Sequence, residues 1–460
     1  MLPASARDRF EDVVGPLGCL DSPEELDIYG YDGGVDRHPP ELVLLPRSVE
    51  EVAAIARIAH ELKIPLVGRG AATGLSGGSV PCQGGVVVAF ARMNKILEID
   101  LENERAIVEP GVVNLDITAA VEGQGYCFAP DPSSRRACTI GGNVAENSGG
   151  AHAPACGVTA SHVLGLEFVL PGGAVVQTGG KEADLPGYDL TGLVTGSEGT
   201  LALVTKVIVR LTRKPETAKV ALAIFESIEA AMGAVSKIAA RAIAPSALEL
   251  IDGPMLRIIE EATPAGYPVD AAAALLVGLE GMRERVDEKV KRVREVCILC
   301  GAREFHLART ADERDLLWKG RNDAFGAVGR VSPEYLVPDG VVPRTEIAAM
   351  LAFIGEVSGR SGLAIGSIVH AADGHLLPVI LFDPRRPGDL EKARAAAAEI
   401  LEACIRAGGS ITGGHGVGMQ KLPLMGKLFS EDSLGVMRNL KRLFDPAGIL
   451  NPGKALPAGG

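Results

Sequence analysis

The spacing of apolar residues over the first half of the chain predicts short strands interspersed with helices. The apolar run at 41–46 is followed by a segment, 48–63, whose apolar positions recur on one face of a helix, with Ser48 and Glu51 as a capping box. Further apolar runs predict strands at 64–70, 84–90, 96–101, 105–111 and 201–213, and a hairpin formed by 163–170 and 174–178. Such a mixture with short turns is typical of an α+β fold.

A second pattern begins after the polar segment 213–219. Its predicted order is strand, helix, strand, strand, helix, strand, at 219–226, 227–243, 246–252, 271–280, 281–296 and 303–308. This is a doubled β-α-β order, which is consistent with a ferredoxin-like unit.

Composition and charge exclude several classes of protein. The 460 residues are 47% hydrophobic and 23% charged, an ordinary globular balance, and the formal net charge is −12. No basic stripe is present, so nucleic acid is not an expected partner. The N-terminus lacks the apolar core of a signal peptide, and no apolar run is long enough to span a membrane. We therefore expect a cytoplasmic protein that meets a membrane only through a partner.

The eight cysteines lie mostly singly, in apolar or glycine-rich surroundings, which predicts reduced thiols. Cys297 and Cys300 form a C-x-x-C, but no second pair or histidine cluster completes a zinc site. We interpret them as packing residues in preference to a redox pair.

Three glycine-rich segments, 67–81, 131–159 and 195–209, are candidates for ligand binding. The first follows a predicted strand, and consecutive backbone N–H groups in such a loop can surround an anion such as a pyrophosphate. It is not the Rossmann fingerprint, because its third glycine falls one position late. Taken alone it could also be a flexible turn. The second segment is longer than loops without a function usually are.

These three segments, in this order and with the terminal LNPGK at 450–454, resemble the FAD-linked oxidases of the vanillyl-alcohol oxidase type. Within them, the resemblance is strongest to the D-2-hydroxyacid dehydrogenases, which include glycolate oxidase flavoprotein subunits and D-lactate dehydrogenases. It covers about residues 20–457. It implies an α+β fold with an FAD-binding domain at 1–215, a ferredoxin-like substrate cap at 216–410 and a C-terminal segment, 411–460, that returns to the first domain.

The resemblance also implies which residues contact FAD. The first loop has no histidine, so the cofactor is expected to be non-covalent. The implied contacts are Val67, Gly68, Arg69, Gly70, Ala71, Ala72, Thr73, Gly74, Gly77, Gly78 and Ser79 around the pyrophosphate; Pro130, Asp131, Thr139, Gly142, Asn143, Ser148, Gly149, Gly157 and Val158 along the flavin and ribityl chain; Glu198, Gly199 and Ile208 on the adenine side; and Asn451 at the flavin.

Oxidation of a 2-hydroxyacid needs a cation for the carboxylate and a base for the hydroxyl proton. The resemblance assigns the first role to Arg321, whose fork of donors suits a carboxylate; the alternative is a solvated helix arginine. It assigns the second role to His415 in TGGHGVG. Tyr335 is a weaker candidate that would line the same pocket.

The stretch HAADGHLLP at 370–378 departs from the family pattern H-x-G-D-G-N-x-H. His370 matches the first ligand of the family's divalent metal, but Leu377 and Gly414 stand where the other two ligands belong, and neither side chain can donate to a metal. We therefore expect no metal. A new site built from His370, Asp373 and His375 stays open, although these groups are better interpreted as hydrogen-bonding one another and lining the pocket.

The sequence thus predicts an FAD-dependent dehydrogenase of a small D-2-hydroxyacid. It would pass electrons to an iron–sulfur subunit, an electron-transferring flavoprotein or a quinone, and it could form oligomers. The missing ligands keep open a flavin-binding subunit with little catalysis that serves as an assembly or relay partner. An oxidase of a different alcohol is a third possibility. The substrate and the acceptor are left undecided.

Overall fold

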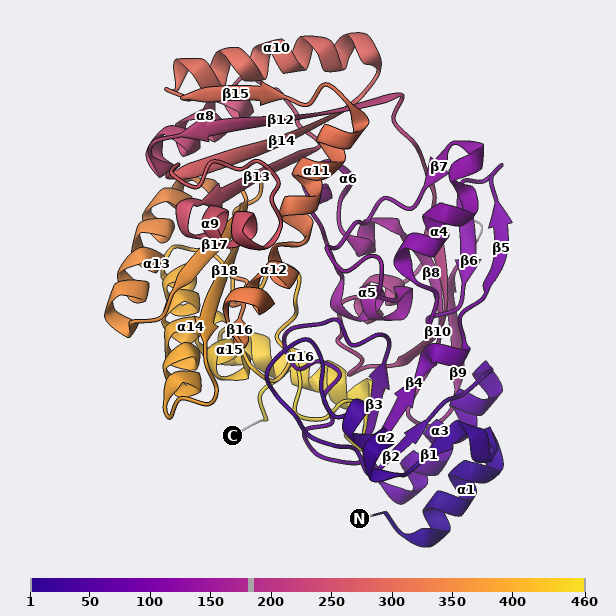
Figure 1. Cartoon of the computed structure of the whole chain (residues 1–460). Helices are drawn as coiled ribbons and strands as arrows, with labels where there is room; N and C mark the ends of the chain where they lie inside the picture. The colour runs from indigo at the N-terminus through magenta and orange to yellow at the C-terminus, as the bar shows by residue number, and fades with distance from the viewer. Residues whose placement is uncertain (1, 181–185, 459–460) are drawn as a thin grey trace. The chain divides into compact units, whose positions relative to one another are not determined.

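The chain divides into two compact units in the computed structural model, which describes residues 2–180 and 186–458. Unit 1 contains Met1–Gly150, Gly157–Lys214 and Gly414–Gly460, and unit 2 contains Ala151–Cys156 and Pro215–Gly413 (Figure 1). The C-terminal segment from Gly414 onward thus folds with the N-terminal part of the chain.

One sheet of unit 1 is mostly parallel, and most residues of its strands are buried. Its order is β1 (Cys19–Leu20), β2 (Leu42–Leu44), β4 (Val86–Ala89) and β3 (Leu66–Arg69), with β2, β4 and β3 parallel. Every residue of β2 and β4 is buried, which explains their uninterrupted valines and leucines. Helices α1 (Ala4–Val14) and α3 (Val49–Leu62) contribute Phe10 and Ile55 to the same core.

The predicted start of α3 is half confirmed. The Ser48 side chain accepts the N–H of Glu51 at 3.3 Å and so caps the helix. The other bond of the predicted capping box, from the Ser48 N–H to the Glu51 carboxylate, is wrong, because that carboxylate accepts the N–H of Arg47 at 2.7 Å.

The second sheet of unit 1 is antiparallel. Its order is β5 (Ile96–Asp100), β6 (Arg105–Val108), β10 (Leu203–Arg210), β8 (Val163–Val169) and β9 (Val175–Gly179), so the predicted β8–β9 hairpin is confirmed. The predicted strand at 201–213 breaks at Leu211, and β11 (Thr212–Arg213) pairs instead with β7 (Tyr126–Cys127). The other helices of the unit are α2 (Pro23–Ile28), α4 (Asn114–Val121), α5 (Ile140–Glu146), α7 (Leu190–Val194), α15 (Leu422–Leu428) and α16 (Glu431–Phe444).

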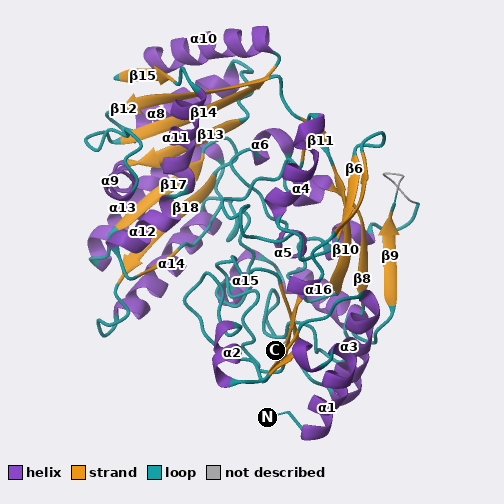
Figure 2. Ribbon diagram, turned by 45° about the vertical axis from the view of Figure 1, so that its right-hand side comes forward, coloured by secondary structure: helices purple, strands orange, loops and turns teal. Residues whose placement is uncertain are grey.

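Unit 2 is built on one seven-stranded sheet in which every neighbouring pair is antiparallel (Figure 2). Its order is β15 (Glu304–Leu307), β12 (Thr217–Phe225), β14 (Ala273–Gly281), β13 (Ala247–Asp252), β17 (Ile365–His370), β18 (His375–Phe382) and β16 (Glu334–Leu336). The first four have the ferredoxin-like order, as predicted. The helices are α6 (Ala153–Cys156), α8 (Ile228–Ala240), α9 (Gly253–Ala262), α10 (Arg283–Leu299), α11 (Ala311–Asn322), α12 (Ala324–Val331), α13 (Ile347–Ser361) and α14 (Asp389–Arg406).

Helix α9 is an addition to the predicted order, inserted between β13 and β14. Asp252 caps it by accepting the N–H of Met255 at 2.9 Å, and a proline occupies its first turn. Its buried face carries Met255, Leu256 and Ile259.

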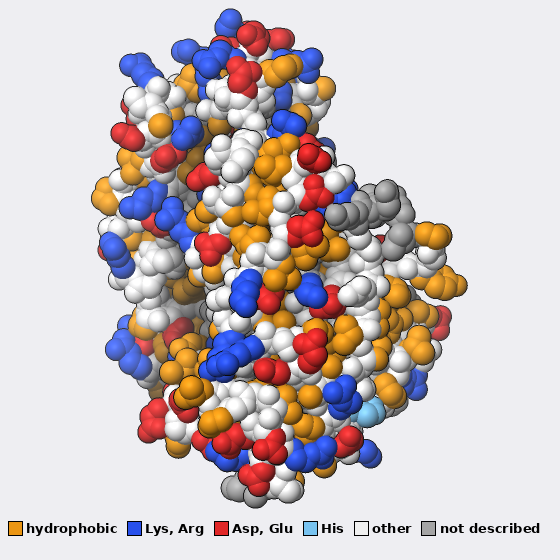
Figure 3. All heavy atoms as spheres, turned by 90° about the vertical axis from the view of Figure 1, so that its right-hand side faces the viewer, with side chains coloured by type: hydrophobic (Ala, Val, Ile, Leu, Met, Phe, Trp, Pro, Cys, Tyr) orange, Lys and Arg blue, Asp and Glu red, His pale blue; other side chains and the backbone are white. Residues whose placement is uncertain are grey.

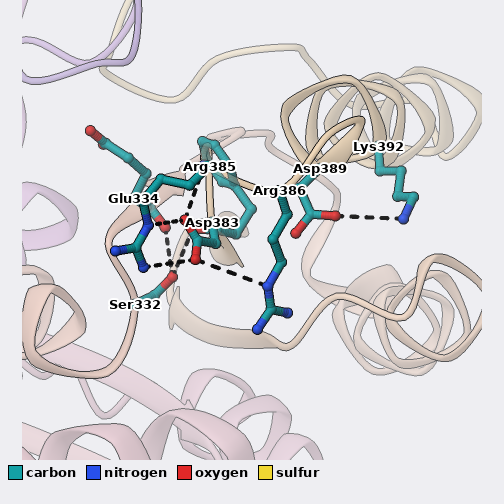
Figure 4. Close-up of polar contacts among 8 residues, drawn as sticks. Ser332, Glu334, Asp383, Arg385, Arg386, Asp389 and Lys392 are labelled. Carbon is teal, nitrogen blue, oxygen red and sulfur yellow. Dashed lines mark hydrogen bonds and ion pairs between the residues drawn. The ribbon is translucent and has the colours of Figure 1, made fainter.

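The turn between β18 and α14 is held by its own charges (Figure 4). Asp383 receives two bonds of 2.8 Å from the guanidinium of Arg385, and Arg386 lies 4.0 Å away. The hydrogen bond with Arg385 lowers the pKa of Asp383 to about 2. Just before β16, the Ser332 hydroxyl lies 2.9 Å from the carbonyl oxygens of Glu334 and Phe382.

The surface drawn in Figure 3 carries basic and acidic side chains interspersed, without a basic stripe. Among the described residues, no helix combines the length and the apolar character that crossing a membrane requires.

The hairpin that joins β17 to β18 depends on Gly374, which has φ +85° and would place a Cβ 1.8 Å from the carbonyl oxygen of Val342. Gly388 has nearly the same φ, +84°, with nothing within 4 Å. We predict that Gly388→Ala costs only the strain of a left-handed alanine, about 1–2 kcal/mol, whereas Gly374→Ala lowers the melting temperature much further. Thermal unfolding of the two variants checks this; equal losses would contradict it.

Candidate active site

The first glycine-rich loop leaves β3 at the edge of a parallel sheet and packs tightly in unit 1. A Cβ on Gly70 would lie 2.2 Å from Thr139 Oγ1, so only glycine fits there. The hydroxyls of Thr139 and Ser76 are buried and have no hydrogen-bond partner among the described residues. Buried hydroxyls of this kind call for a partner that the protein does not supply. Together with the backbone amides of the loop, they suit the phosphates and hydroxyls of a dinucleotide.

Part of the loop is committed to other contacts. The N–H of Gly77 donates to the Asp32 carboxylate at 2.9 Å, and the Arg69 guanidinium donates to the carbonyl of Tyr31 at 2.6 Å. The Arg69 side chain therefore fixes the segment around Tyr31, and its predicted cofactor contact stays a prediction. Burial raises the pKa of Asp32 to about 6, although the amides of Gly34 and Gly77 oppose the rise.

The second predicted segment forms one hydrogen-bonded cluster in unit 1. The Asn143 side chain is buried; it accepts a bond from Asn114 at 3.0 Å and contacts Cys138. Asn114 also donates to the carbonyl of Pro130 at 3.3 Å, so Asn143 positions the loop instead of exposing its amide. Nearby, the Ser148 carbonyl accepts the Thr159 hydroxyl at 2.7 Å.

Two glycines of this segment, Gly150 and Gly157, are required by close packing or by a left-handed backbone. A Cβ on Gly150 would lie 2.3 Å from the carbonyl oxygen of Asp131, which ties the two ends of the segment together. Gly157, with φ +85°, precedes Val158, the N-cap of the short turn that follows. Gly142 lies on α5 with Thr139 3.7 Å from its Cβ position, and Gly149 follows Ser148 just outside the helix.

Of the residues predicted on the adenine side, Glu198 contacts Asn451 of the C-terminal segment. The Asn451 amide donates to the carbonyls of Gly78, at 2.8 Å, and Glu198, at 2.7 Å. The Glu198 carboxylate accepts backbone N–H groups from the segment that follows His415. Gly199 has φ +67°, and Ile208 lies half-buried in β10 opposite Ile107.

In unit 2, three predicted or newly found residues form a buried network across neighbouring elements. Arg321 on α11 donates from Nε to Glu249 at 2.7 Å, and His370 Nδ1 lies 2.5 Å from the other oxygen of Glu249. Arg321 is only 1% exposed, so the alternative of a solvated helix arginine is wrong. Burial by itself raises the pKa of Glu249, but His370 and Arg321 outweigh it and bring the pKa down to about 2.

The His375 imidazole faces a second carboxylate, that of Asp339. Its ring lies 5.0 Å from that of His370, and its Nε2 lies 3.5 Å from Asp339. Asp339 also accepts the Thr412 hydroxyl at 2.9 Å and the Gly413 N–H at 3.1 Å. Burial lowers the pKa of His375, which favours the neutral imidazole.

Tyr335 and His415 occupy different places. Tyr335 lies on β16 of the unit 2 sheet, stacked on Phe325, and burial raises the pKa of its hydroxyl. His415 is half-buried in unit 1, two residues after Gly413 leaves unit 2. The structure therefore brings Arg321, His370 and His375 together within unit 2, and His415 together with the glycine loops within unit 1.

The residues present do not fit the divalent metal of the resembling family. Leu377 is buried in β18 opposite Ile368, and Gly414 has no side chain. His370 and His375 each face a different carboxylate, and among the described residues no three such groups are arranged to hold a metal. Asp373 instead accepts the backbone N–H of His375 at 3.2 Å.

Glu249 and Asp339 are functional candidates that sequence reasoning missed. Each is a single carboxylate inside an apolar stretch, ALELI and VPDGVV, and both side chains are fully buried. In each case a single charged residue stands among apolar neighbours, Glu249 within β13 and Asp339 just after β16. This is the signal that could have found them, since buried charges are seldom unpaired.

Two family models match the chain, the FAD binding domain at residues 40–179 and the C-terminal domain of FAD linked oxidases at 214–455. The glycolate oxidase subunit GlcD of Escherichia coli K12 is 44% identical, over 97% of this chain and 90% of the relative. The chain belongs to the FAD-linked oxidase family. The GlcD subunit of Bacillus subtilis is 42% identical, over 99% and 97% of the two chains.

The fold is shared with solved flavoenzymes. The p-cresol methylhydroxylase structure with bound substrate has a TM-score of 0.84 at 21% identity, covering 98% of this chain and 96% of the other. The 4-ethylphenol oxidase of Gulosibacter chungangensis has a TM-score of 0.83, also at 21% identity, covering 98% and 97%. The predicted fold, the FAD cofactor and the oxidoreductase class of this FAD-linked oxidase are confirmed.

The absence of a metal stays a prediction that elemental analysis can test. Because Leu377 and Gly414 cannot ligate, we expect FAD-loaded protein to retain far less than one zinc or manganese per chain after dialysis. A near-stoichiometric metal that is lost in His375→Ala would contradict this expectation.

The raised pKa of Asp32 leads us to predict that the stability difference between Asp32→Asn and the unchanged protein changes with pH. The pKa of Asp32 is about 6 in the folded protein and near 3.9 in the unfolded chain. Its favourable contribution to the free energy of unfolding is therefore fully present below pH 4 and is lost as the pH rises through 6. Asp32→Asn should therefore gain stability relative to the unchanged protein between pH 4.5 and 7, by roughly 2–3 kcal/mol. Melting curves of both FAD-saturated proteins across this range test it, and parallel curves would contradict it.

Proposed function

We propose that this FAD-linked oxidase oxidises a small D-2-hydroxyacid, of the glycolate or D-lactate type, to the corresponding 2-oxoacid. The observation that carries the proposal is the 44% identity to a glycolate oxidase subunit across 97% of this chain and 90% of the relative. A probable mitochondrial D-lactate dehydrogenase of Danio rerio, 29% identical over 97% of this chain, supports the same class of substrate.

Each role in the reaction has a candidate in the chain. Bound FAD would be held by the glycine loops and by Thr139, and it supplies the acceptor for the hydride on C2 of the substrate. The imidazole of His415 would take the hydroxyl proton, which a histidine does well near neutral pH. Arg321 would attract the substrate carboxylate.

The geometry around Arg321 limits how it can bind. Its Nε is committed to Glu249, so contact with a substrate carboxylate must come through the terminal guanidinium nitrogens. Glu249 also offsets the charge of Arg321, which makes the local charge less positive than that of an unpaired arginine. We expect this balance to favour a small monocarboxylate over a dicarboxylate such as D-2-hydroxyglutarate.

We further propose that a partner subunit receives the electrons. GlcD is named as a subunit of glycolate oxidase, which suggests an assembly of several chains. An iron–sulfur subunit or an electron-transferring flavoprotein has suitable chemistry, and a partner of this kind could also place the protein at a membrane.

A second function is favoured by specific residues. Leu377 and Gly414 replace two family ligands, and the Arg321 side chain is 2% exposed. These features suit a flavin-binding subunit with little catalysis of its own that serves in assembly or electron relay.

Anaerobic mixing of the FAD-loaded protein with glycolate, D-lactate and D-2-hydroxyglutarate separates the two functions. We expect glycolate or D-lactate to bleach the flavin absorbance, and Arg321→Lys to raise the half-saturating concentration by about tenfold or more, since lysine lacks the fork. Val331→Ala, a substitution at an exposed position of the neighbouring helix α12, serves as the control.

If no hydroxyacid reduces the flavin while dithionite does, the proposed dehydrogenase is wrong and the relay function stands. Equal half-saturating concentrations for the unchanged protein and Arg321→Lys would contradict the role given to Arg321.

A further inference from the structure

The carboxylate of Glu198 binds the backbone that follows His415. Oε1 accepts the N–H of Val417 at 2.7 Å, and Oε2 accepts the N–H of Gly418 at 2.7 Å. Glu198 is 6% exposed, so both bonds lie away from water. Hydrogen bonds to an ionised acceptor are about twice as strong as neutral ones. The pair therefore fixes the backbone two and three residues beyond His415.

The backbone of Glu198 shows that this side chain is needed. Its φ is +53°, a left-handed conformation that costs a residue with a Cβ about 1–2 kcal/mol. Its neighbours Gly196 and Gly199 have φ of +81° and +67°, so the turn otherwise uses glycine. A strained residue other than glycine in such a turn points to a role for its side chain.

The charge of Glu198 is compensated inside the protein. Burial raises its pKa, while the two backbone amides and then Lys421 and Lys454 favour the ionised form. Lys421 also donates to the carbonyl of Gly416 at 2.9 Å, so it holds the same segment from the other side. Both lysines are buried.

The segment held by Glu198 also packs on the glycine loop. A Cβ on Gly418 would lie 2.0 Å from the carbonyl oxygen of Ser76, and the N–H of Met419 donates to that oxygen at 3.0 Å. A Cβ on Gly416 would lie 2.2 Å from a carboxylate oxygen of Glu146 on α5. At Gly418 a larger side chain would meet backbone and does not fit, and at Gly416 the left-handed φ of +81° disfavours any residue other than glycine.

Asn451 joins Glu198 to the same loop. Its amide bridges the carbonyls of Glu198 and Gly78, two residues from Ser76. The first glycine loop, the turn at Glu198 and Asn451 thus belong to one hydrogen-bonded network with the segment 416–419.

We infer that Glu198 is a positioning residue that holds the His415 segment in register with the glycine loop of the flavin site. This inference rests on the proposed function, in which His415 acts as the base. The expected contact of Glu198 with the adenine side stays a prediction; both of its carboxylate oxygens accept backbone N–H groups. An imidazole displaced by about 1 Å can lose about 100-fold in rate even when the binding of substrate is unchanged.

Two variants of graded severity test the inference. Glu198→Gln has the same shape but can accept only one of the two N–H groups, and Glu198→Ala accepts neither. Asp252→Asn, a buried carboxylate that accepts the N–H of Met255 in unit 2, is the matched control for loss of a buried charge.

The first readout is independent of activity: hydrogen exchange of the peptide that covers residues 414–421 in the FAD-loaded protein. We expect one amide of this peptide to lose protection in Glu198→Gln and two in Glu198→Ala, with no change in Asp252→Asn. Unchanged protection of this peptide in both Glu198 variants would overturn the inference, whatever substrate the protein takes.

The second readout is the rate of anaerobic flavin reduction at saturating substrate. We expect about a tenfold fall in Glu198→Gln and about a 100-fold fall in Glu198→Ala, with FAD content and half-saturating concentration changed less than about twofold. Loss of FAD in step with the rate would show a structural role instead. If the substrate does not reduce the flavin of the unchanged protein at all, the proposed function fails. Hydrogen exchange alone then tests whether Glu198 holds the His415 segment.

Discussion

The pair of hydrogen bonds from Val417 and Gly418 to the buried carboxylate of Glu198 is the interaction on which unit 1 depends. A buried carboxylate without donors would cost several kcal/mol, so this geometry is strongly preferred once the chain has folded around it. Through Asn451 the same turn is tied to Gly78. A single compensated charge thus joins segments that lie more than 200 residues apart in the sequence.

In unit 2, too, buried carboxylates join segments that lie far apart in the sequence. Glu249 lies on β13 directly opposite His370 on β17, and Arg321 reaches it from α11. One carboxylate oxygen accepts the Nε–H of Arg321 at 2.7 Å, and the other lies 2.5 Å from Nδ1 of His370. Asp339 similarly joins His375 to Thr412.

The strands and the main helices could be predicted from the sequence because their apolar periodicity is local. Leu42–Leu44 and Val86–Ala89 read as buried strands without reference to any other residue. Helix α9 was missed because its ten residues follow a strand without a break, although its cap at Asp252, its proline and the helical spacing of its apolar residues are local signals. The predicted bond from the Ser48 N–H to the Glu51 carboxylate was wrong because that carboxylate accepts the N–H of Arg47.

The candidate site was predicted less completely, for a physical reason. A motif marks where a residue lies in the chain, but the partner of a buried charge is set by tertiary structure. Glu198 stands in a recognisable turn, yet its two acceptors are used by Val417 and Gly418, which no local pattern reveals. Arg321 was predicted to bind a carboxylate, with a solvated arginine as the alternative, and its buried partner Glu249 was not foreseen.

The most direct test of a hydroxyacid oxidation that needs no metal is the isotope effect on flavin reduction after chelation. Chelator-treated, FAD-loaded protein would be mixed anaerobically with D-lactate and with D-lactate deuterated at C2. The account predicts that reduction persists and that deuterium slows it severalfold. Equal rates for the two substrates, or reduction that stops on chelation and returns with added zinc, would contradict it.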